Sequence, residues 1–250
     1  MKLSAIVTTM NNEHTIARCI GSLRFADEIV VVDSGSTDRT REICSELGAV
    51  VYERTAWRGH GPQKNRAREL AKAPWVLSID SDEWVTPELR AEVEAAMADP
   101  NAKAAYAMPR RSSFCGRFMR HSGWWPDYVT RLFRSDSARF SDDEGPHDRL
   151  IVDGRIGRLR HPIMHEAIVD LDQMLTKMNG YSRSIAHMKL REGARATLAK
   201  AIVHGAWMFF RTYVLRLGFL DGREGFILAV ANAEGSYYRY VKLMMLARQR

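Results

Sequence analysis

Two aspartates separated by one residue, Asp80 and Asp82, are the strongest chemical signal in this sequence. They follow Trp75-Val-Leu-Ser-Ile, an apolar run that is typical of a buried strand. Where a strand ends in a turn, two such carboxylates can both reach a hard divalent cation, which can neutralise a diphosphate. The alternative is a solvated turn that caps the helix beginning at Pro87. The position directly after a strand favours the metal-binding interpretation.

Asp33 lies in a similar position, at the end of the apolar run that begins at Glu28. A carboxylate at a strand end can accept a hydrogen bond from a ring N–H, such as the imide of uracil. The alternative is a cap for the next helix, which Ser34, Ser36 or Thr37 could equally supply. This redundancy favours a binding role for Asp33. No GxGxxG follows the first strand, which excludes the dinucleotide-binding fingerprint.

Two polar segments could complete a nucleotide site. Asn11, Asn12 and Glu13 follow the first strand and could either bind a ribose or base or cap a helix. Lys64 and Arg66 follow a glycine-containing loop and could meet a phosphate, or they could belong to an ordinary helix start. The residues alone leave both alternatives open for each segment.

Three further groups give weaker signals. Asp148 lies in an acidic loop and could take a proton from an attacking hydroxyl, although such loops are usually only solvated. His161 and His165 are four residues apart and could bind a metal, but no HExxH context supports this. Trp124 and Trp125 could pack on a sugar ring, although a position in the core is more common for aromatic side chains.

The elements that must position these residues alternate along the first hundred residues. Strand-like apolar runs occur at residues 3–9, 28–32, 49–52 and 75–79. Each is followed by a helical pattern, at residues 13–24, 62–72 and 87–98, and between the turn that ends at Asp38 and a plausible stop at Gly48. Such alternation predicts an α/β fold with a mostly parallel sheet and helices on both faces. Because ligands bind beyond the carboxyl ends of such strands, we expect Asp33, Asp80 and Asp82 to converge on one edge.

The rest of the chain has a different pattern. Residues 104–160 carry short extended runs between polar turns, which indicates an antiparallel extension with long loops. From about residue 170 the pattern is helical, and further helices are expected over residues 195–217 and 224–247. No apolar stretch reaches about 18 uninterrupted residues, so a spanning helix is not expected. The N-terminus lacks the apolar region of a secretory signal.

The positive charge is concentrated at the C-terminal end. The chain has 37 Lys and Arg against 30 Asp and Glu, a net charge of +7. Residues 189–250 hold 11 of the basic residues and 4 of the acidic ones, which accounts for the whole excess. These basic residues are mixed with Trp207, Phe210 and Tyr213, which favours an anionic membrane surface over nucleic acid as a partner. Three cysteines without CxxC spacing indicate free thiols in a reducing compartment.

Several segments resemble the family 2 glycosyltransferases, which have the GT-A fold. The matching segments are Ala5-Ile-Val-Thr-Thr-Met-Asn-Asn-Glu, Asp27-Glu-Ile-Val-Val-Val-Asp-Ser-Gly-Ser-Thr-Asp-Arg-Thr and Trp75-Val-Leu-Ser-Ile-Asp-Ser-Asp-Glu-Trp. Residues 123–128, Arg131-Leu-Phe-Arg, His147-Asp148 and residues 218–225 resemble the bacterial lipopolysaccharide core glucosyltransferases. That branch transfers a sugar onto the inner-core heptose of lipid A–core.

The resemblance implies a GT-A catalytic domain over residues 1–165, with a nucleotide-sugar-binding half over 1–100 and an acceptor-side half over 101–165. Residues 166–250 would then form a helical, basic extension that associates with a membrane. The resemblance also implies a UDP-sugar donor, a divalent cation (Mg²⁺ or Mn²⁺) and inversion at the anomeric carbon.

The family's functional positions can be carried over residue by residue. Donor-binding positions fall on Thr8, Asn11, Asp33, Lys64 and Asp80. Asp82, together with Asp80, matches the metal-binding aspartates, and Asp148 matches the catalytic base. The family usually has Glu where this chain has Asn12 and Asp148, so these two positions depart from its pattern.

The expected function is that of an inverting hexosyltransferase, which moves a hexose, with glucose the expected sugar, from a UDP-sugar to a lipopolysaccharide inner-core acceptor. The expected location is cytoplasmic and peripheral, on the inner face of the inner membrane, where a lipid-linked acceptor lies. The nearest alternative is a family 2 enzyme acting on a polyprenyl-phosphate or exopolysaccharide acceptor. A non-catalytic membrane-binding or nucleic-acid-binding protein is the alternative from another class, and it would show no metal-dependent affinity for UDP.

Overall fold

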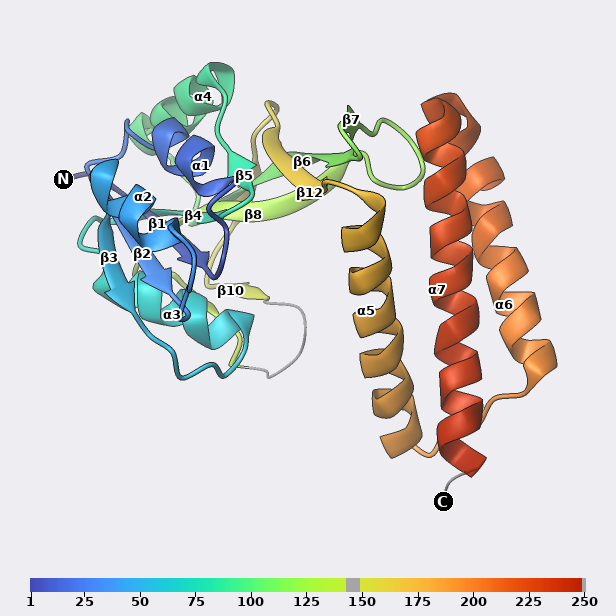
Figure 1. The fold of residues 1–250 in the computed structure, drawn as a ribbon. Coiled ribbons are helices and arrows are strands. Elements are labelled where there is room, and N and C mark those ends of the chain that lie inside the picture. The colour runs from blue at the N-terminus through green and yellow to red at the C-terminus, as the bar shows by residue number, and fades with distance from the viewer. Residues whose placement is uncertain (143–148, 249–250) are drawn as a thin grey trace. The chain divides into compact units, whose positions relative to one another are not determined.

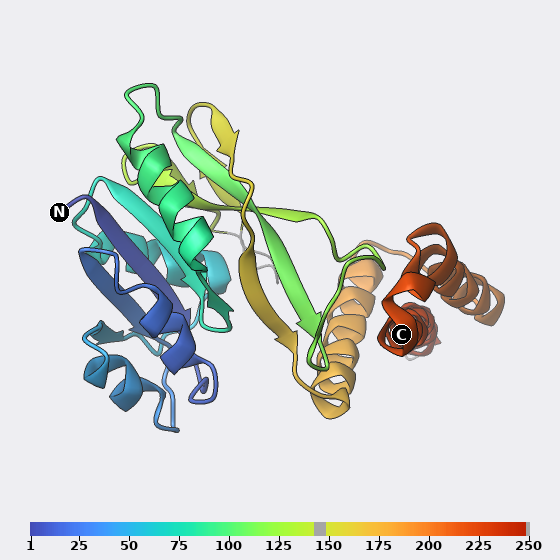
Figure 2. The ribbon, with the colours of Figure 1, turned by 90° about the horizontal axis from the view of Figure 1, so that it is seen from above.

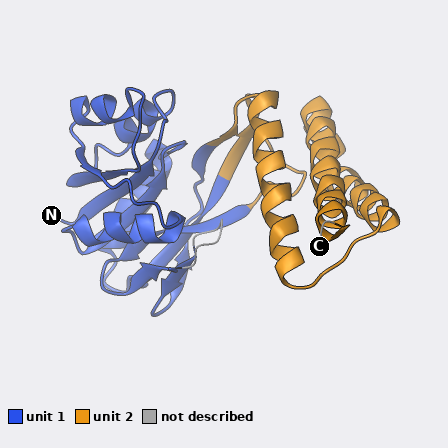
Figure 3. Ribbon diagram, turned by 60° about the horizontal axis from the view of Figure 1, so that its bottom comes forward, with its two compact units in different colours: residues 1–110, 127–165 blue, residues 111–126, 166–250 orange. Residues whose placement is uncertain are grey.

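The computed structural model describes residues 1–142 and 149–248 and has two compact units (Figure 3). Unit 1 comprises Met1–Arg110 and Asp127–His165, and unit 2 comprises Arg111–Pro126 and Glu166–Arg250. The division expected from the sequence, at residue 165, differs from this in one segment. Arg111–Pro126 belongs to the helical unit and not to the α/β unit.

Unit 1 begins with four parallel strands in the order β3-β2-β1-β4 (Figure 1). The strands are β1 (Leu3–Thr9), β2 (Glu28–Asp33), β3 (Val50–Glu53) and β4 (Trp75–Asp80). The helices that alternate with them are α1 (Ile16–Ser22), α2 (Thr40–Glu46), α3 (His60–Leu70) and α4 (Pro87–Ala98). The predicted α/β alternation is confirmed.

The side chains of β1 show why both faces of this sheet are covered. Successive strand residues point to opposite faces, so Ala5 and Val7 pack in one apolar cluster and Ile6 packs in another. The first cluster includes Leu89 of α4 and also residues of α1 and α2, whereas the second includes Ala67 of α3. The predicted arrangement of helices on both faces is therefore confirmed (Figure 1).

Beyond β4 the sheet becomes antiparallel, in the order β4-β8-β6-β12-β5 (Figure 2). The strands added to this sheet are β5 (Glu83–Trp84), β6 (Ala105–Phe114), β7 (Arg117–Phe118), β8 (Asp127–Arg134), β11 (Ile156–Arg158) and β12 (Ile163–Ile168), of which β11 pairs with β6 in parallel. Strands β9 (Ala138–Phe140) and β10 (Leu150–Val152) form a separate antiparallel pair. The antiparallel extension predicted over residues 104–160 is confirmed. The sheet as a whole is mixed, because no helix crosses over between β6 and β8 and neighbouring strands can then pair antiparallel.

Unit 2 is built around three long helices. They are α5 (Leu171–Arg191), α6 (Leu198–Phe210) and α7 (Gly222–Arg248), with a π-helical turn η1 (Arg211–Leu215) and a 3₁₀ turn η2 (Gly218–Asp221) between the last two. Asp170 caps α5 and Thr197 caps α6, since each side chain accepts a backbone N–H of the first turn. In the part of the chain that the structure describes, no helix combines the length and the apolar character needed to cross a membrane.

The Gly-Phe-Leu-Asp-Gly-Arg-Glu-Gly segment has a structural role in unit 2. The buried Asp221 carboxylate accepts the backbone N–H of Arg120 and the hydroxyl of Ser122, both at 3.0 Å. A Cβ atom on Gly225 would lie 1.9 Å from the carbonyl oxygen of Gly218, so a side chain cannot fit there. The segment therefore fixes the loop before Trp124 to the start of α7.

Candidate functional site

The parallel register brings the predicted polar residues to one edge of the sheet in unit 1. At the ends of the strands, Thr9 of β1 lies opposite Asp33 of β2, and Thr8 lies opposite Asp80 of β4. Asp82 follows two residues later in the turn between β4 and β5. The ends of these three strands thus meet, as the alternation of strands and helices predicts.

Asp80 is held by two buried cations. Its Oδ1 lies 2.7 Å from the Nζ of Lys64, and its Oδ2 accepts a hydrogen bond from the guanidinium of Arg131. Burial by itself raises the pKa of Asp80, but Arg131 and Lys64 outweigh it and hold the pKa well below its ordinary value. Asp80 is therefore an ionised carboxylate in a fixed orientation. Lys64 contacts this carboxylate from α3, so the predicted donor-binding position Lys64 lies beside Asp80.

Glu83 is a residue of this site to which the sequence analysis assigned no role. Its buried carboxylate accepts the guanidinium of Arg131 at 2.6 Å and the backbone N–H of Asp80 at 3.0 Å, and Arg110 lies 3.7 Å away. Burial raises the pKa of Glu83, Arg131 opposes this and Asp80 adds to it. Two sequence signals mark these residues but not their pairing: Glu83 directly follows Asp82, and Arg131 begins the Arg-Leu-Phe-Arg segment.

Asp82 pairs with a histidine from a distant part of the chain. Its Oδ2 lies 3.4 Å from the Nε2 of His165, which β12 places opposite Glu83 of β5. The other histidine of the predicted pair, His161, instead contacts Glu92 with its Nδ1 at 3.1 Å. The two histidines therefore do not form one cluster. Across residues 1–142 and 149–248 no three His, Cys, Asp or Glu side chains group in a way that could hold a metal ion.

The capping roles differ from those considered at the two strand ends. The helix that begins at Pro87 is capped by Thr86, whose hydroxyl accepts the N–H of Leu89 at 3.3 Å. Asp82 is not its cap. Asp33, in contrast, does stabilise the turn after its strand, because its Oδ1 accepts the backbone N–H of Gly35 at 3.0 Å. Asp33 therefore stabilises this turn itself, although Ser34, Ser36 and Thr37 could also have done so.

The loop around Asp33 also fixes Asn11. Asp33 is fully buried and accepts the hydroxyl of Ser36. Ser36 in turn accepts the N–H of Asn11 at 2.9 Å, and the exposed Asn11 side chain accepts the N–H of Thr37 at 2.8 Å. Asn11 has a positive φ of 54°, a conformation that asparagine tolerates better than most residues. The two strand ends are thus linked by hydrogen bonds.

A pocket of about 380 Å³ adjoins Asp80 in unit 1. Its charged lining consists of Asp80, Arg110, Arg131 and Arg149. Arg110 also donates to Asp127 at 2.6 Å, whereas the guanidinium of Arg149 has no ion-pair partner among residues 1–142 and 149–248. This excess of guanidinium groups suits an anionic ligand.

Two predicted features lie elsewhere. Asp148, matched to the catalytic base, lies outside the described residues, and Arg149 is the next residue that the structure describes. Trp124 belongs to unit 2, where its ring packs edge-on against Phe114 at a centroid distance of 6.0 Å. Trp124 thus packs against an apolar cluster of unit 2, as is common for aromatic side chains.

The comparisons with known proteins agree with one another on the fold. The family called Glycosyl transferase family 2 matches residues 4–148. An uncharacterized glycosyltransferase of Rickettsia conorii is 30% identical, over 97% of this chain and 89% of that protein. The lipopolysaccharide core biosynthesis glycosyltransferase LpsC of Rhizobium meliloti is 29% identical, over 97% of this chain and 92% of that protein.

Among solved structures, TarS 1–349 of S. aureus in complex with UDP-GlcNAc is similar, with a TM-score of 0.53 and 20% identity. The match covers 100% of this chain and 92% of that chain. At this level of identity the similarity establishes the fold, and it extends over both units.

Proposed function

Because the chain belongs to glycosyl transferase family 2, and is thus a transferase, we propose that it moves a hexose from a UDP-sugar to a lipopolysaccharide inner-core acceptor. The observation that carries the proposal is the meeting of Asp33, Asp80 and Asp82 at one sheet edge, beside a pocket rich in arginine. The choice of acceptor is supported by the similarity to LpsC. Glucose is the sugar that the resemblance to the core glucosyltransferases suggests.

The donor would lie along the carboxyl ends of β1, β2 and β4. Asp33, with Thr8 and Asn11 beside it, would bind the base and ribose. Asp33 is fully buried, accepts three hydrogen bonds and lies 3.8 Å from the Nε of Arg41, so the base would reach it only where one of these partners gives way. Asp80, fixed by Lys64, would accept a hydroxyl of the donor.

A divalent cation would bind at the same edge, where the sequence predicts Asp80 and Asp82 as its ligands. Asp80 already contacts a cation with each oxygen, so Asp82 and His165 are the better ligands. Carboxylate oxygens are the ligands that Mg²⁺ and Mn²⁺ prefer, so Asp82 would be the first ligand of either ion and His165 a secondary one. When bound, such a cation neutralises the charge of the departing diphosphate.

The chemistry that we propose is a single displacement. Asp148 would accept the proton of the acceptor hydroxyl as its oxygen attacks the anomeric carbon, from the face opposite the departing UDP. The C–O bond to UDP breaks as the new glycosidic bond forms, so the configuration inverts and no sugar is attached to the enzyme. Arg131 and Glu83 would act by holding Asp80 in place.

Unit 2 would hold the enzyme at the membrane. Its helix α6 exposes about half of each of the apolar side chains Ile202, Val203 and Trp207, while Lys200 lies on the same helix. Exposed apolar and aromatic groups beside basic ones bind anionic interfaces by partial insertion together with charge attraction. We propose that this surface docks on the inner face of the inner membrane without spanning it.

The proposal is tested with UDP-glucose and a heptosylated lipid A acceptor. We expect transfer by the wild-type protein and at least about a hundredfold lower kcat for Asp148→Asn, since base catalysis contributes 10²–10⁴-fold. UDP binding by Asp148→Asn should be unchanged. The matched control is Asp153→Asn, an exposed aspartate in the same region, which should keep full activity.

The product also separates the acceptors. Transfer to polyprenyl phosphate or to an exopolysaccharide, with none to heptosylated lipid A, would favour the alternative acceptor class. Normal turnover by Asp148→Asn would remove this residue as the base.

A further inference from the structure

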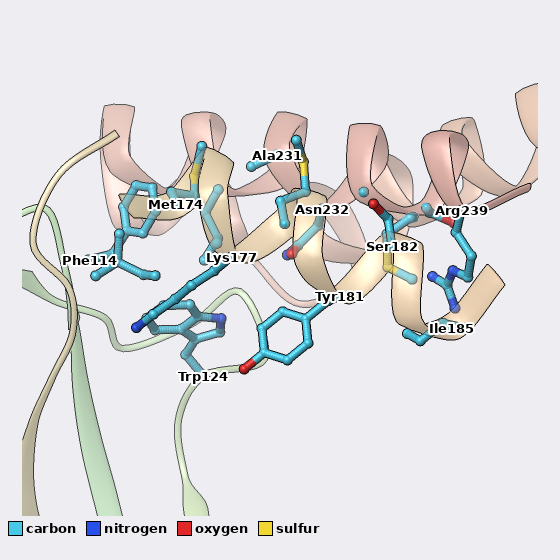
Figure 4. Close-up of a pocket in the computed structure, with 16 residues that line it drawn as sticks. Phe114, Trp124, Met174, Lys177, Tyr181, Ser182, Ile185, Ala231, Asn232 and Arg239 are labelled. Carbon is cyan, nitrogen blue, oxygen red and sulfur yellow. The ribbon is translucent and has the colours of Figure 1, made fainter. Parts of the chain in front are cut away.

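We propose that a cavity inside unit 2 binds one hydrocarbon chain of an anionic lipid. The cavity has a volume of about 280 Å³ and lies between α5 and α7 (Figure 4). Phe114 and Trp124 line one end and Ile185 lines the other, with Met174 and Ala231 between them. This site goes beyond the proposed function. There, unit 2 docks on a membrane surface, whereas here a single lipid molecule would enter the cavity.

The size and lining of the cavity suit a flexible apolar chain. An engineered apolar cavity of about 150 Å³ binds benzene, so this one has room for roughly twice that volume of hydrocarbon. Three methionines, Met174, Met178 and Met208, contribute to the lining. Methionine side chains are flexible and polarisable and can adapt to a ligand of variable shape. A chain of methylene groups would meet these requirements better than a rigid polar molecule.

The charges of the lining select the kind of head group. Lys177 and Arg239 lie toward opposite ends of the cavity (Figure 4), and none of the 16 described residues that line it is acidic. The Nζ of Lys177 donates to the carbonyl of Ala167 at 2.8 Å, which leaves ammonium protons for another acceptor. Arg239 has no ion-pair partner among the described residues 166–248. Each cation is therefore available to a phosphate at its own end of the cavity.

The surface beside the cavity also suits a lipid. Tyr181 lines the cavity and is 51% exposed, and Leu175 on the same helix is 39% exposed. An aromatic side chain with one polar end is typical of the boundary between acyl chains and head groups. The occupant is thus an acyl chain whose phosphate lies near Lys177 or Arg239.

The experiment titrates monomeric lysophosphatidylglycerol, below its critical micelle concentration, into the full-length protein by calorimetry. No nucleotide sugar is present, so the result is independent of transferase activity. We expect saturable binding of one molecule, and binding of the neutral lysophosphatidylcholine that is about tenfold weaker. Absence of saturable binding, or equal affinity for the two lipids, would overturn the proposal.

Variants locate the site. Lys177→Met should weaken binding of the anionic lipid more than that of the zwitterionic one. Arg183→Met, which removes a charge from an exposed position of α5 outside the cavity, should alter neither. Ala231→Leu should block the cavity. A second measurement does not require Ala231→Leu to fold. A lysolipid with bromine on its chain should quench tryptophan fluorescence in the wild-type protein, and should quench it less in Trp124→Phe. Equal quenching in both proteins would place the chain elsewhere.

Discussion

The two units differ in the charged side chains that they bury and the large apolar side chains that they expose. Unit 1 buries charged side chains near its sheet edge, namely Asp33, Lys64, Glu83 and Arg131. Unit 2 leaves large apolar side chains exposed, among them Trp207 and Leu220. Buried charges are tolerated only where opposite charges and hydrogen bonds satisfy them, and they then fix one another's orientation. Exposed apolar side chains are not held in one orientation by such bonds, and large patches of them mark sites that a partner can cover.

The largest effect on stability is expected from breaking the charge network of unit 1. Arg131→Met leaves Asp80 and Glu83 without their shared cation, and removing one partner of a buried pair costs about 3–5 kcal/mol. Urea unfolding followed by circular dichroism measures this. The matched control is Arg134→Met in the same strand, where a cation–π contact to Trp75 is lost at a cost of about 0.5–1 kcal/mol. If the two variants lose similar amounts of unfolding free energy, the buried ion pairs of Arg131 contribute no more than the cation–π contact of Arg134.

A smaller effect, dependent on pH, is expected from Asp80→Asn. The folded-state pKa of Asp80 lies below its unfolded value, because Arg131 and Lys64 outweigh the effect of burial. Its ionisation therefore stabilises the fold above the unfolded pKa of about 3.9, and this stabilisation is lost as the pH falls through the folded pKa. The wild-type protein should exceed Asp80→Asn by about 2 kcal/mol at pH 7, and the difference should shrink below about pH 5. A difference independent of pH would contradict this assignment.

A still smaller effect is expected when exposed apolar side chains of unit 2 are changed. Trp207→Ser should reduce affinity for vesicles with anionic lipids about tenfold, since burying a large apolar side chain contributes about 1.5–3 kcal/mol. The free energy of unfolding in solution should stay within about 0.5 kcal/mol. His187→Ser, at an exposed position of α5, serves as the control and should bind vesicles as the wild type does. Unchanged vesicle affinity of Trp207→Ser would separate this surface from membrane binding.

The reactivity of the three cysteine thiols should also differ between the two units. Cys19 and Cys44 are buried in unit 1, whereas Cys115 in unit 2 is exposed. Burial, followed by the charge of Asp33, raises the pKa of Cys44 to about 12, which suppresses its reactive thiolate. A thiol reagent should therefore modify one cysteine in the native protein and three in urea. Fast reaction of a second native thiol would show that unit 1 opens readily.

The sequence predicted the fold of unit 1 well because its local signals agree. Strand β1 spans the residues expected, and α4 begins at Pro87 as expected. The convergence at the sheet edge also followed, since parallel strands place their ends together. The long helices of unit 2 were predicted from the same kind of periodicity.

What the sequence did not predict depends on contacts between distant segments. The ion pair of Asp80 with Arg131 joins β4 to β8, and that of Asp82 with His165 involves β12, so neither follows from local spacing. The placement of Arg111–Pro126 in the helical unit likewise depends on a long-range bond, from Arg120 to Asp221. Charge balance in a buried site is a property of the folded chain as a whole.

The central claim is that this sheet edge binds a UDP-sugar with the help of a cation at Asp82. Calorimetric titration of UDP-glucose into the full-length protein, with Mn²⁺ and then with excess EDTA, tests it most directly. We expect saturable binding with Mn²⁺, at least about tenfold weaker binding with EDTA, and loss of this dependence on Mn²⁺ in Asp82→Asn. Equal affinity with and without the cation, or no binding of UDP-glucose under either condition, would contradict it.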